Sequence, residues 1–380
     1  MNRLNNPIRG SSKPNGALIF TPTKELCAQV YNSLKRLDLK NQIRIFRTGS
    51  LGYDFKQKNR VGKILIQTGE SDHFFLSFLD WKKVDILIST PTQLDILMKS
   101  QKSGPELLNP KFTVLDEFDQ LLTDRKYYDG LTSVLDSLGS NVRGKQMTEN
   151  HLDRKFVLAG ASILKTIFGK PAKKYLDMHF HDLNLVQSER FLKVNKKIAF
   201  EDYNVESLNK EDRMLLLRQI IDRDKPERVL VFCNDASDVL DVQKYLEVEA
   251  DIQTVAFHSK MSDSERASVI YAFENGKQTV LVSTDLSARG LDFKNIPLVV
   301  QFGYAENGIN LLHRIGRTGR MGASGRVISF VDAPNHLLYS EFMQSLKEDK
   351  PLDSTFSRNR SFNKRMKRIG EEVATETNDN

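Results

Sequence analysis

The sequence is poor in cysteine and contains no long apolar run. Its two cysteines, Cys27 and Cys233, are about two hundred residues apart. This spacing excludes a disulfide framework and a cysteine-based zinc site, and it favours a reducing compartment. No segment approaches the ~20 consecutive apolar residues that a membrane-spanning helix needs. We therefore expect no membrane association.

Acidic residues are missing from the start of the chain, where the first is Glu25. Basic residues occur there, but without the amphipathic Arg/Ser periodicity of a targeting peptide. Over the whole chain, 56 Lys and Arg face 49 Asp and Glu, a formal net charge of +7. This balance favours a polyanionic partner such as nucleic acid, although many mildly basic proteins bind none.

Short β-branched apolar runs alternate with longer amphipathic segments along the 380 residues. This rhythm is typical of α/β domains whose parallel strands are buried on both faces. The predicted organisation is a first domain at 1–190, a polar linker at 191–206, a second domain at 207–346 and a basic, polar tail at 347–380 with the composition of a disordered segment. The predicted strands are 17–20, 43–46, 64–67, 84–88, 112–115, 156–158, 229–232, 253–257, 279–282, 298–302 and 326–330.

An acidic turn follows the predicted strand 112–115. It places Asp116, Glu117 and Asp119 within four positions. At the carboxyl edge of an open α/β sheet, adjacent carboxylates can hold Mg²⁺ and polarise a water molecule. A helix start with acidic first-turn residues explains the same pattern. This motif alone leaves both interpretations open.

A cluster of arginines occurs in "HRIGRTGR", residues 313–320. Arg314, Arg317 and Arg320 recur every three residues, which predicts that they lie near one helical face. They would repel one another unless an anion lay among them, as arginines do at a transferring phosphoryl group. Gly316 and Gly319 allow close backbone approach and weaken the helix, which a solvated basic helix does not explain.

Together these motifs resemble the DEAD-box RNA helicases. "FTPTKELCAQ", "STPTQL", "VLDEFD", "GAS", "VLVFCND", "HSKMSDSER", "STDLSARGLDF" and "HRIGRTGR" occur in that family's order and at about its separations over residues 16–330. The series looks closest to divergent fungal mitochondrial members. The resemblance implies two RecA-like parallel-sheet α/β domains, ATP and Mg²⁺ as cofactors, RNA as partner and a monomeric protein.

The resemblance also implies roles for individual residues. Asp116 would hold the magnesium ion, and Glu117 would orient or deprotonate the attacking water. Arg317 and Arg320 would reach the γ-phosphate from the second domain, and His313 would couple their motif to the first domain.

Further roles follow from the same resemblance. Asp292 would lie near the ribose, and Asp119 is assigned to cofactor binding. Gly160, Ala161 and Ser162 stand where the family has Ser-Ala-Thr and would couple hydrolysis to unwinding. The RNA backbone would be contacted by Pro22, Thr23, Gly49, Thr90, Pro91, Arg266, Thr284 and Gly290.

Four positions depart from the family pattern. Phe118 replaces a tightly packed alanine, so its ring needs room. Gly160 lacks the hydroxyl of the family's serine, which weakens the coupling hydrogen bonds. Gln93 replaces an arginine, which weakens one phosphate contact. Asp263 replaces a glutamine.

The largest departure concerns the Gly-rich phosphate loop that ends in Gly-Lys-Thr. No such loop lies in the sixteen residues before Ala17. "GSNVRGKQ" at 139–146 fits the first part of that motif, but it follows a helical pattern and we interpret it as a surface loop. We expect an N-terminally shortened chain in which Met1 is an internal methionine. The upstream reading frame tests this expectation. Loss of a central strand would leave an unpaired sheet edge and a poorly stable first domain.

Three functions follow as expectations. The first is ATP-dependent remodelling of RNA, with mitochondrial ribosomal RNA and large-subunit assembly in the matrix as the finer expectation. The second is a non-hydrolysing RNA-binding module, because the phosphate loop is missing from the sequence. The third is a DNA helicase of a related family. RNA selectivity would require contacts to the 2′-hydroxyl groups.

Overall fold

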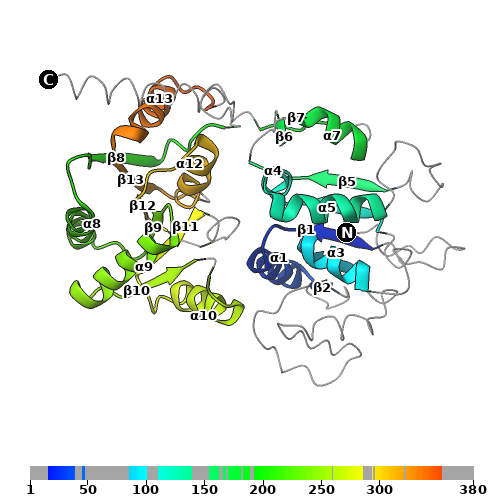
Figure 1. Cartoon of the computed structure of the whole chain (residues 1–380), viewed down its shortest axis with the longest axis horizontal. Coiled ribbons are helices and arrows are strands. Elements are labelled where there is room, and N and C mark those ends of the chain that lie inside the picture. The colour runs from blue at the N-terminus through cyan, green and yellow to red at the C-terminus, as the bar shows by residue number, and fades with distance from the viewer. Residues whose placement is uncertain are drawn as a thin grey trace, which may run out of the picture. The chain divides into compact units, whose positions relative to one another are not determined.

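The chain folds into two compact units, Met1–Val186 and Gln187–Asn380, here called the first and second unit. Figure 1 colours the first from blue to green and the second from green to orange. The computed structural model describes residues 16–38, 45–47, 85–100, 110–138, 154–161, 166–167, 170–180, 183–188, 192–258, 260–285, 293, 296–320 and 322–352. The predicted fold class of two parallel-sheet α/β units is confirmed.

The first unit is built on a five-stranded parallel sheet in the order β2-β3-β1-β4-β5. Its strands are β1 (Ala17–Phe20), β2 (Ile45–Arg47), β3 (Ile86–Ser89), β4 (Phe112–Leu115) and β5 (Lys155–Leu158). The predicted strands 17–20 and 112–115 match β1 and β4, and three others are displaced by one or two residues. The predicted strand 64–67 lies outside the described residues.

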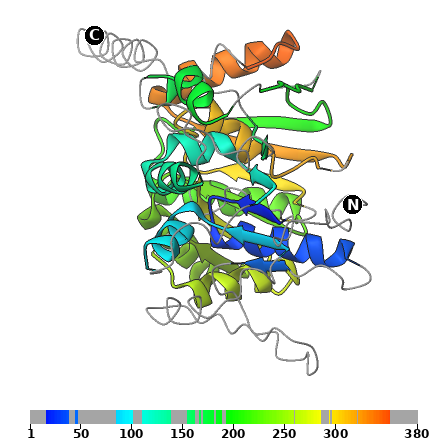
Figure 2. The same ribbon diagram turned by 90° about the vertical axis from the view of Figure 1, so that its right-hand side faces the viewer.

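Alternate residues of these strands face two different helical layers, because successive side chains of a strand point to opposite faces. On one face, Cys27 and Leu34 of α1 (Lys24–Leu37) pack with Ile19 and Ile88. Leu18 and its neighbours instead join a core with α3 (Pro91–Ser100), α4 (Phe118–Thr123), α5 (Arg125–Ser137) and α7 (Ala172–His179). Figure 2 turns this unit toward the viewer, with α1 in blue. A short antiparallel pair, β6 (Thr166–Ile167) and β7 (Lys170–Pro171), precedes α7.

Part of this sheet has no cover among the described residues. Phe112 of β4 is 37% exposed and Val157 of β5 is 51% exposed, whereas Phe156 and Leu158 pack against the opposite core. Within the described ranges β5 pairs only with β4. Among the residues that the structure describes, the strand therefore presents an open backbone edge beside an exposed apolar side chain.

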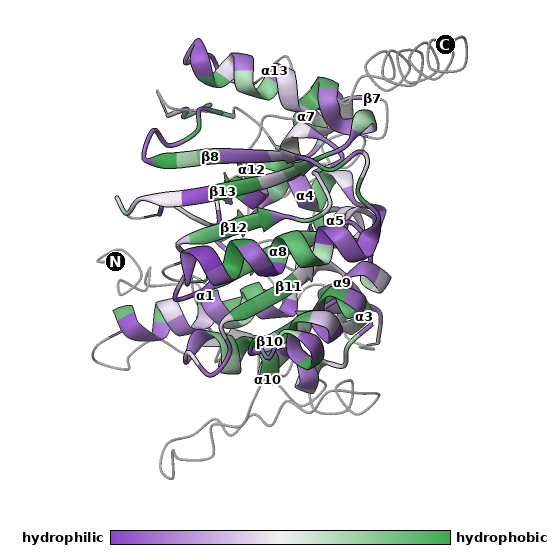
Figure 3. Ribbon diagram, turned by 90° about the vertical axis from the view of Figure 1, so that its left-hand side faces the viewer, coloured by the Kyte–Doolittle hydropathy of each residue, from purple (hydrophilic) through white to green (hydrophobic). Residues whose placement is uncertain are grey.

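The second unit has a six-stranded parallel sheet in the order β10-β11-β9-β12-β13-β8. Its strands are β8 (Ile198–Asn204), β9 (Val229–Cys233), β10 (Thr254–Phe257), β11 (Val280–Thr284), β12 (Leu298–Gln301) and β13 (Gly325–Val331). Every residue of β9 and β12 is buried, as continuous apolar runs predict. Figure 3 shows β11 and β12 as mainly hydrophobic and β8 as largely hydrophilic.

Helices again form two layers around this sheet. Leu230 and Phe232 face one apolar core, and Val229 and Val231 face the other. The helices are α8 (Lys210–Asp224), α9 (Ala236–Lys244), η3 (Tyr245–Glu249), α10 (Asp263–Glu274), α12 (Gly308–Ile315), η4 (Ala333–Asn335) and α13 (His336–Lys347). The helices of both units that can be placed are too short or too polar to cross a membrane.

Strand β8 corrects the predicted organisation, because it lies inside the stretch 191–206 that the sequence indicates as a linker. It pairs with β13 at the sheet edge. Ile198 is buried, but Glu201 and Tyr203 are only half-buried, and Glu201 accepts a hydrogen bond from Arg223 at 3.0 Å. An edge strand mixes apolar and charged residues, so it lacks the continuous apolar run that identifies a central strand.

Candidate active site

The carboxyl ends of the strands in the first unit gather most of its predicted site residues along one edge. The register sets Phe20 opposite both Ser89 and Leu115, so these strands end level with one another. Such an edge is where open α/β sheets place their ligands. The predicted residues that directly follow these strand ends are Pro22, Thr23, Thr90, Pro91, Asp116, Glu117, Gly160 and Ala161. Gly49 and Ser162 lie outside the described residues.

The acidic turn, residues 116–119, has an unusual backbone. Glu117 adopts a left-handed conformation with φ 52° and ψ 46°. For a residue with a Cβ this conformation costs about 1–2 kcal/mol. The turn is held by hydrogen bonds from the Asp116 N–H to the Phe20 carbonyl and from the Phe118 N–H to the Ala159 carbonyl, both 2.9 Å long. Backbone strain that neighbouring elements enforce is typical of functional sites.

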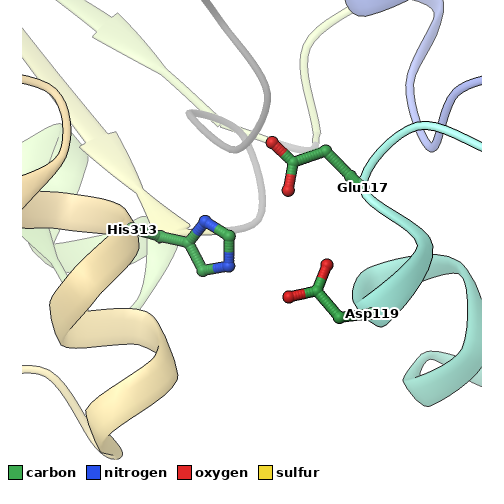
Figure 4. Close-up of side chains that lie close together, drawn as sticks. All are labelled: Glu117, Asp119 and His313. Atoms are coloured by element: carbon green, nitrogen blue, oxygen red, sulfur yellow. The ribbon is translucent and has the colours of Figure 1, made fainter. Parts of the chain in front are cut away.

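The carboxylates of the turn form a concentrated negative charge. Burial raises the pKa of Asp116, the Glu117 N–H lowers it through a 3.1 Å hydrogen bond, and the charge of Asp119 raises it again. Carboxylate oxygens of Glu117 and Asp119 lie within 4.8 Å of each other at the start of α4 (Figure 4). Clustered hard oxygen ligands of this kind match the preferences of Mg²⁺, so the donor set fits that ion.

The helix-start interpretation of the acidic motif is also partly correct, because α4 begins at Phe118. However, the side chain of Glu117 makes no capping hydrogen bond to this helix. Thr23 at the start of α1 behaves differently, since its hydroxyl accepts from the Leu26 N–H at 3.2 Å. Capping therefore accounts for Thr23 but not for the Glu117 carboxylate.

Gly130 is a supporting residue that sequence reasoning missed. It lies within α5, and a Cβ at this position would be 3.0 Å from the Thr92 Cα at the start of α3. The Thr92 hydroxyl donates to the Lys126 carbonyl at 2.9 Å. Gly130 thus lets α5 hold the turn that contains Thr90 and Pro91. The available signal was a glycine inside a predicted helix, where it costs ~1 kcal/mol relative to alanine.

In the second unit, the structure corrects the expected arrangement of the three arginines. Helix α12 ends at Ile315, with Gly316 as its C-cap, and Gly319 has φ +63°. Arg317 and Arg320 therefore lie in the arginine turn, residues 316–320, and not on a helical face shared with Arg314. Gly319 takes the left-handed backbone that favours glycine, so the chain does not continue as a helix through it.

The arginine turn begins three residues after His313, the residue predicted to couple this motif to the first domain. His313 projects from α12 (Figure 4). Its carbonyl accepts a 3.0 Å hydrogen bond from Nε of Arg317, whose side chain is buried. Nε of Arg320 donates to the Gly316 carbonyl.

The anion that binds Arg314 is a carboxylate of this protein, Asp285. This corrects the expectation that a phosphoryl group lies among all three arginines. The fully buried guanidinium of Arg314 binds Asp285, with Nε to Oδ1 at 2.6 Å and Nη2 to Oδ2 at 2.8 Å. Nη2 also donates to Oδ1 of Asn234 at 2.9 Å, and the guanidinium lies over the Phe232 ring. Arg314 therefore ties together the residues that follow β9 and β11. Asp285 and Asn234 were missed, although each is a polar residue directly after a buried strand.

The segment before β8 contacts the arginine turn and Gly322, which lies just beyond it. Nδ2 of Asn195 donates to the Gly319 carbonyl at 2.6 Å, and Nζ of Lys197 donates to the Gly322 carbonyl at 2.7 Å. A Cβ on Gly319 would be 2.6 Å from Cγ1 of Ile198. The close approach predicted at Gly319 is thus observed, and its neighbour is the side chain of Ile198.

The remaining predicted residues of the second unit are dispersed over two elements. Thr284 ends β11, and its carbonyl accepts from the Ser283 hydroxyl at 3.1 Å. Arg266 lies in α10, and its Nε donates to the Met261 carbonyl at 3.2 Å. Gly290 and Asp292 lie outside the described residues. Their assigned roles stay predictions.

Comparisons with known sequences agree with the division of the chain into two units. A DEAD/DEAH box helicase model matches residues 2–164, and a helicase conserved C-terminal domain model matches residues 212–322. A probable ATP-dependent RNA helicase, ddx41 of Dictyostelium discoideum, is 31% identical over 334 residues, which cover 87% of this chain and 43% of that protein. The chain spans about half the length of the curated relatives it matches.

Solved structures resemble the fold over most of the chain. The S. cerevisiae protein Dbp5 bound to RNA and ADP BeF3 has a TM-score of 0.66 at 19% identity, covering 91% of this chain and 78% of that one. The helicase Mss116 bound to ssRNA and UDP-BeF has a TM-score of 0.67 at 21% identity, covering 88% and 63%. At these identities the likeness supports the fold.

Proposed function

Because the chain belongs to the DEAD-box helicase family, we propose that it binds RNA and couples ATP hydrolysis to the remodelling of RNA duplexes. The observation that carries this proposal is the acidic turn. Its strained Glu117 stands beside Asp116 at the carboxyl edge of the parallel sheet, and Glu117 does not cap the helix that follows. The relatives' ATP-dependent activity supports the same reading.

The acidic turn would provide the hydrolytic half of the reaction. Asp116 would hold Mg²⁺, which when bound neutralises charge on phosphate oxygens. Glu117 would orient the attacking water and accept its proton. Arg317 and Arg320 would provide positive charge for the phosphate oxygens, because Arg314 is already neutralised by Asp285.

RNA would be held through its backbone at the strand ends. Thr23 and Thr90 begin helices α1 and α3, whose first N–H groups are suited to phosphates. Arg266 and Thr284 would contribute from the second unit. Contacts of this kind are independent of base sequence, so we expect weak base preference and strong salt dependence.

RNA binding without hydrolysis is the second candidate function. It is favoured by Gly160, which stands where the family has a serine and so lacks the hydroxyl expected to couple hydrolysis to unwinding.

ATP hydrolysis by this chain with and without single-stranded RNA distinguishes the two candidates. We expect RNA to stimulate hydrolysis in the unmodified chain and not in Glu117→Gln, which keeps the size and backbone of the residue but removes the proton acceptor. RNA binding at equal affinity in both proteins, with no hydrolysis in either, would support the second candidate. Equal stimulation by DNA of the same sequence would contradict RNA selectivity.

We also propose mitochondrial ribosomal RNA as the target, a role in large-subunit assembly, a matrix location and a monomeric state. The support is the resemblance of the motif series to fungal mitochondrial members of the family. Fractionation of cells that express the gene product and sequencing of RNA cross-linked to it test target and location. Light scattering tests the monomer. Recovery of cytosolic messenger RNA alone would contradict the target.

A further inference from the structure

Two residues that depart from the family pattern lie against each other. A Cβ built on Gly160 would be 2.7 Å from Cδ1 and 2.8 Å from Cε1 of the Phe118 ring. Cβ atoms essentially never approach other carbons this closely. The ring therefore occupies the space that any side chain at position 160 would need.

The ring is half-buried and would lose packing if it moved aside. It packs against the apolar core to which α4 and α5 contribute, so displacing it would expose more of it to water. The backbone of Phe118 is also fixed, since its N–H donates to the Ala159 carbonyl at 2.9 Å. Phe118 thus holds the segment after β5 at two points, one polar and one apolar.

These two points of attachment lie beside the strained residue of the acidic turn. Glu117 precedes Phe118 directly, and Oδ1 of Asp119 would be only 3.2 Å from a Cβ at position 160. A side chain at 160 would displace the ring and crowd this carboxylate. Loss of the ring would remove the apolar attachment and leave the backbone hydrogen bonds of the turn, such as those of the Asp116 and Phe118 N–H groups, to resist the relaxation of Glu117.

We propose that Phe118 and Gly160 form a matched pair that positions the carboxylates of the acidic turn. The pair acts through contact and not through chemistry, so both are positioning residues. Each is compatible with the site only in the presence of the other. The catalytic consequence rests on the proposed function, whereas the contact itself does not.

A double-mutant cycle in the full chain tests the contact. Phe118→Ala and Gly160→Ser are each expected to lower the unfolding temperature of the first unit by roughly 3–10 °C. The double variant should unfold at a higher temperature than Gly160→Ser alone, because the serine occupies the space that the ring leaves. Additive losses would overturn the matched pair.

Phe112→Ala is the matched control, because Phe112 lies at the opposite end of β4 from the acidic turn. Its effect should add to that of Gly160→Ser. Hydrogen exchange followed on peptides spanning 112–122 and 154–161 assigns the changes to this unit. Exchange in 112–122 should be about tenfold faster in Gly160→Ser and slower again once Phe118→Ala is added.

Steady-state hydrolysis of ATP separates positioning from mere stability. Below the unfolding temperature, each single variant should lower kcat by about ten- to a hundredfold with a nearly unchanged KM. The double variant should recover most of kcat, and Phe118→Leu should keep it. Folded single variants with unaltered kcat would overturn the positioning role. If the unmodified chain hydrolyses no ATP, the proposed function fails. The unfolding temperatures and hydrogen exchange of the double-mutant cycle still show whether Phe118 and Gly160 form a matched pair.

Discussion

Glu117 combines backbone strain with the proposed catalytic carboxylate, so stability and activity make opposite demands on it. Glu117→Gly should stabilise the first unit by about 0.5–1 kcal/mol, because glycine adopts the left-handed conformation without a Cβ clash. The same variant should lose RNA-stimulated hydrolysis. Urea unfolding and an ATPase assay measure the two effects.

Glu117→Ala is the control for this prediction. It removes the carboxylate but keeps the Cβ, so hydrolysis should be lost without a gain in stability. Equal stability of the glycine and alanine variants would show that the left-handed backbone is not a source of strain.

Arg314 and Arg320 illustrate how neighbouring arginines of one motif differ. Arg314→Met should destabilise the second unit by about 3–5 kcal/mol, because it leaves the carboxylate of Asp285 without its partner in a largely buried place. Arg320→Met should change the free energy of unfolding by less than ~1 kcal/mol and lower hydrolysis instead. Chemical unfolding and the ATPase assay check both variants. A stable Arg314→Met protein would contradict the structural role of that residue.

At the scale of single elements, buried strands were the most predictable part of the fold. β9 and β12 are buried throughout, so their sequences are continuous apolar runs. The acidic motif was found because charge directly after an apolar run is conspicuous, and the arginine motif because three arginines recur every three residues beside two glycines. β8 was missed because an edge strand shares its residues between core and solvent. The end of α12 was missed because arginine spacing alone does not show where a helix ends.

Strand β8 also contains a carboxylate whose ionisation affects stability. Burial alone would raise the pKa of Glu201, but hydrogen bonds from Arg223, Tyr203 and Arg326 lower it to about 2. A lowered carboxyl pKa stabilises the fold above the ordinary pKa of 4.5, and this contribution is lost as the pH falls from there toward about 2.

Glu201→Gln tests this contribution. The unfolding temperature of the second unit should fall less steeply below pH 4.5 in the variant than in the unmodified chain, because one carboxylate fewer is protonated on unfolding. Scanning calorimetry between neutral and acidic pH measures the difference. Parallel curves for the two proteins would contradict the prediction.

At the scale of the whole molecule, the two sheets are covered unequally within the described residues. Val157 and Phe112 are exposed in the first unit, and β5 has an open edge. We expect two unfolding transitions in urea, the first of which belongs to the first unit. Hydrogen exchange should show less protection for β5 than for the fully buried β9.

Val157→Thr is a specific test of the exposed edge. It keeps a β-branched side chain but makes the face more polar, so the unfolding free energy should change by less than ~0.5 kcal/mol. Aggregation on heating, followed by light scattering, should decrease. Unchanged aggregation would show that the molecules do not associate through the exposed face around Val157.

The contact of Asn195 with the arginine turn, and that of Lys197 with Gly322 just beyond it, have a mechanical consequence. Asn195 donates a hydrogen bond directly to the Gly319 carbonyl. A pulling force applied to the chain before residue 195 would therefore act on the arginine turn without first being transmitted through the sheet. The segment from Asn195 to Lys197 is thus a direct link between the chain ahead of β8 and the residues around the arginine turn.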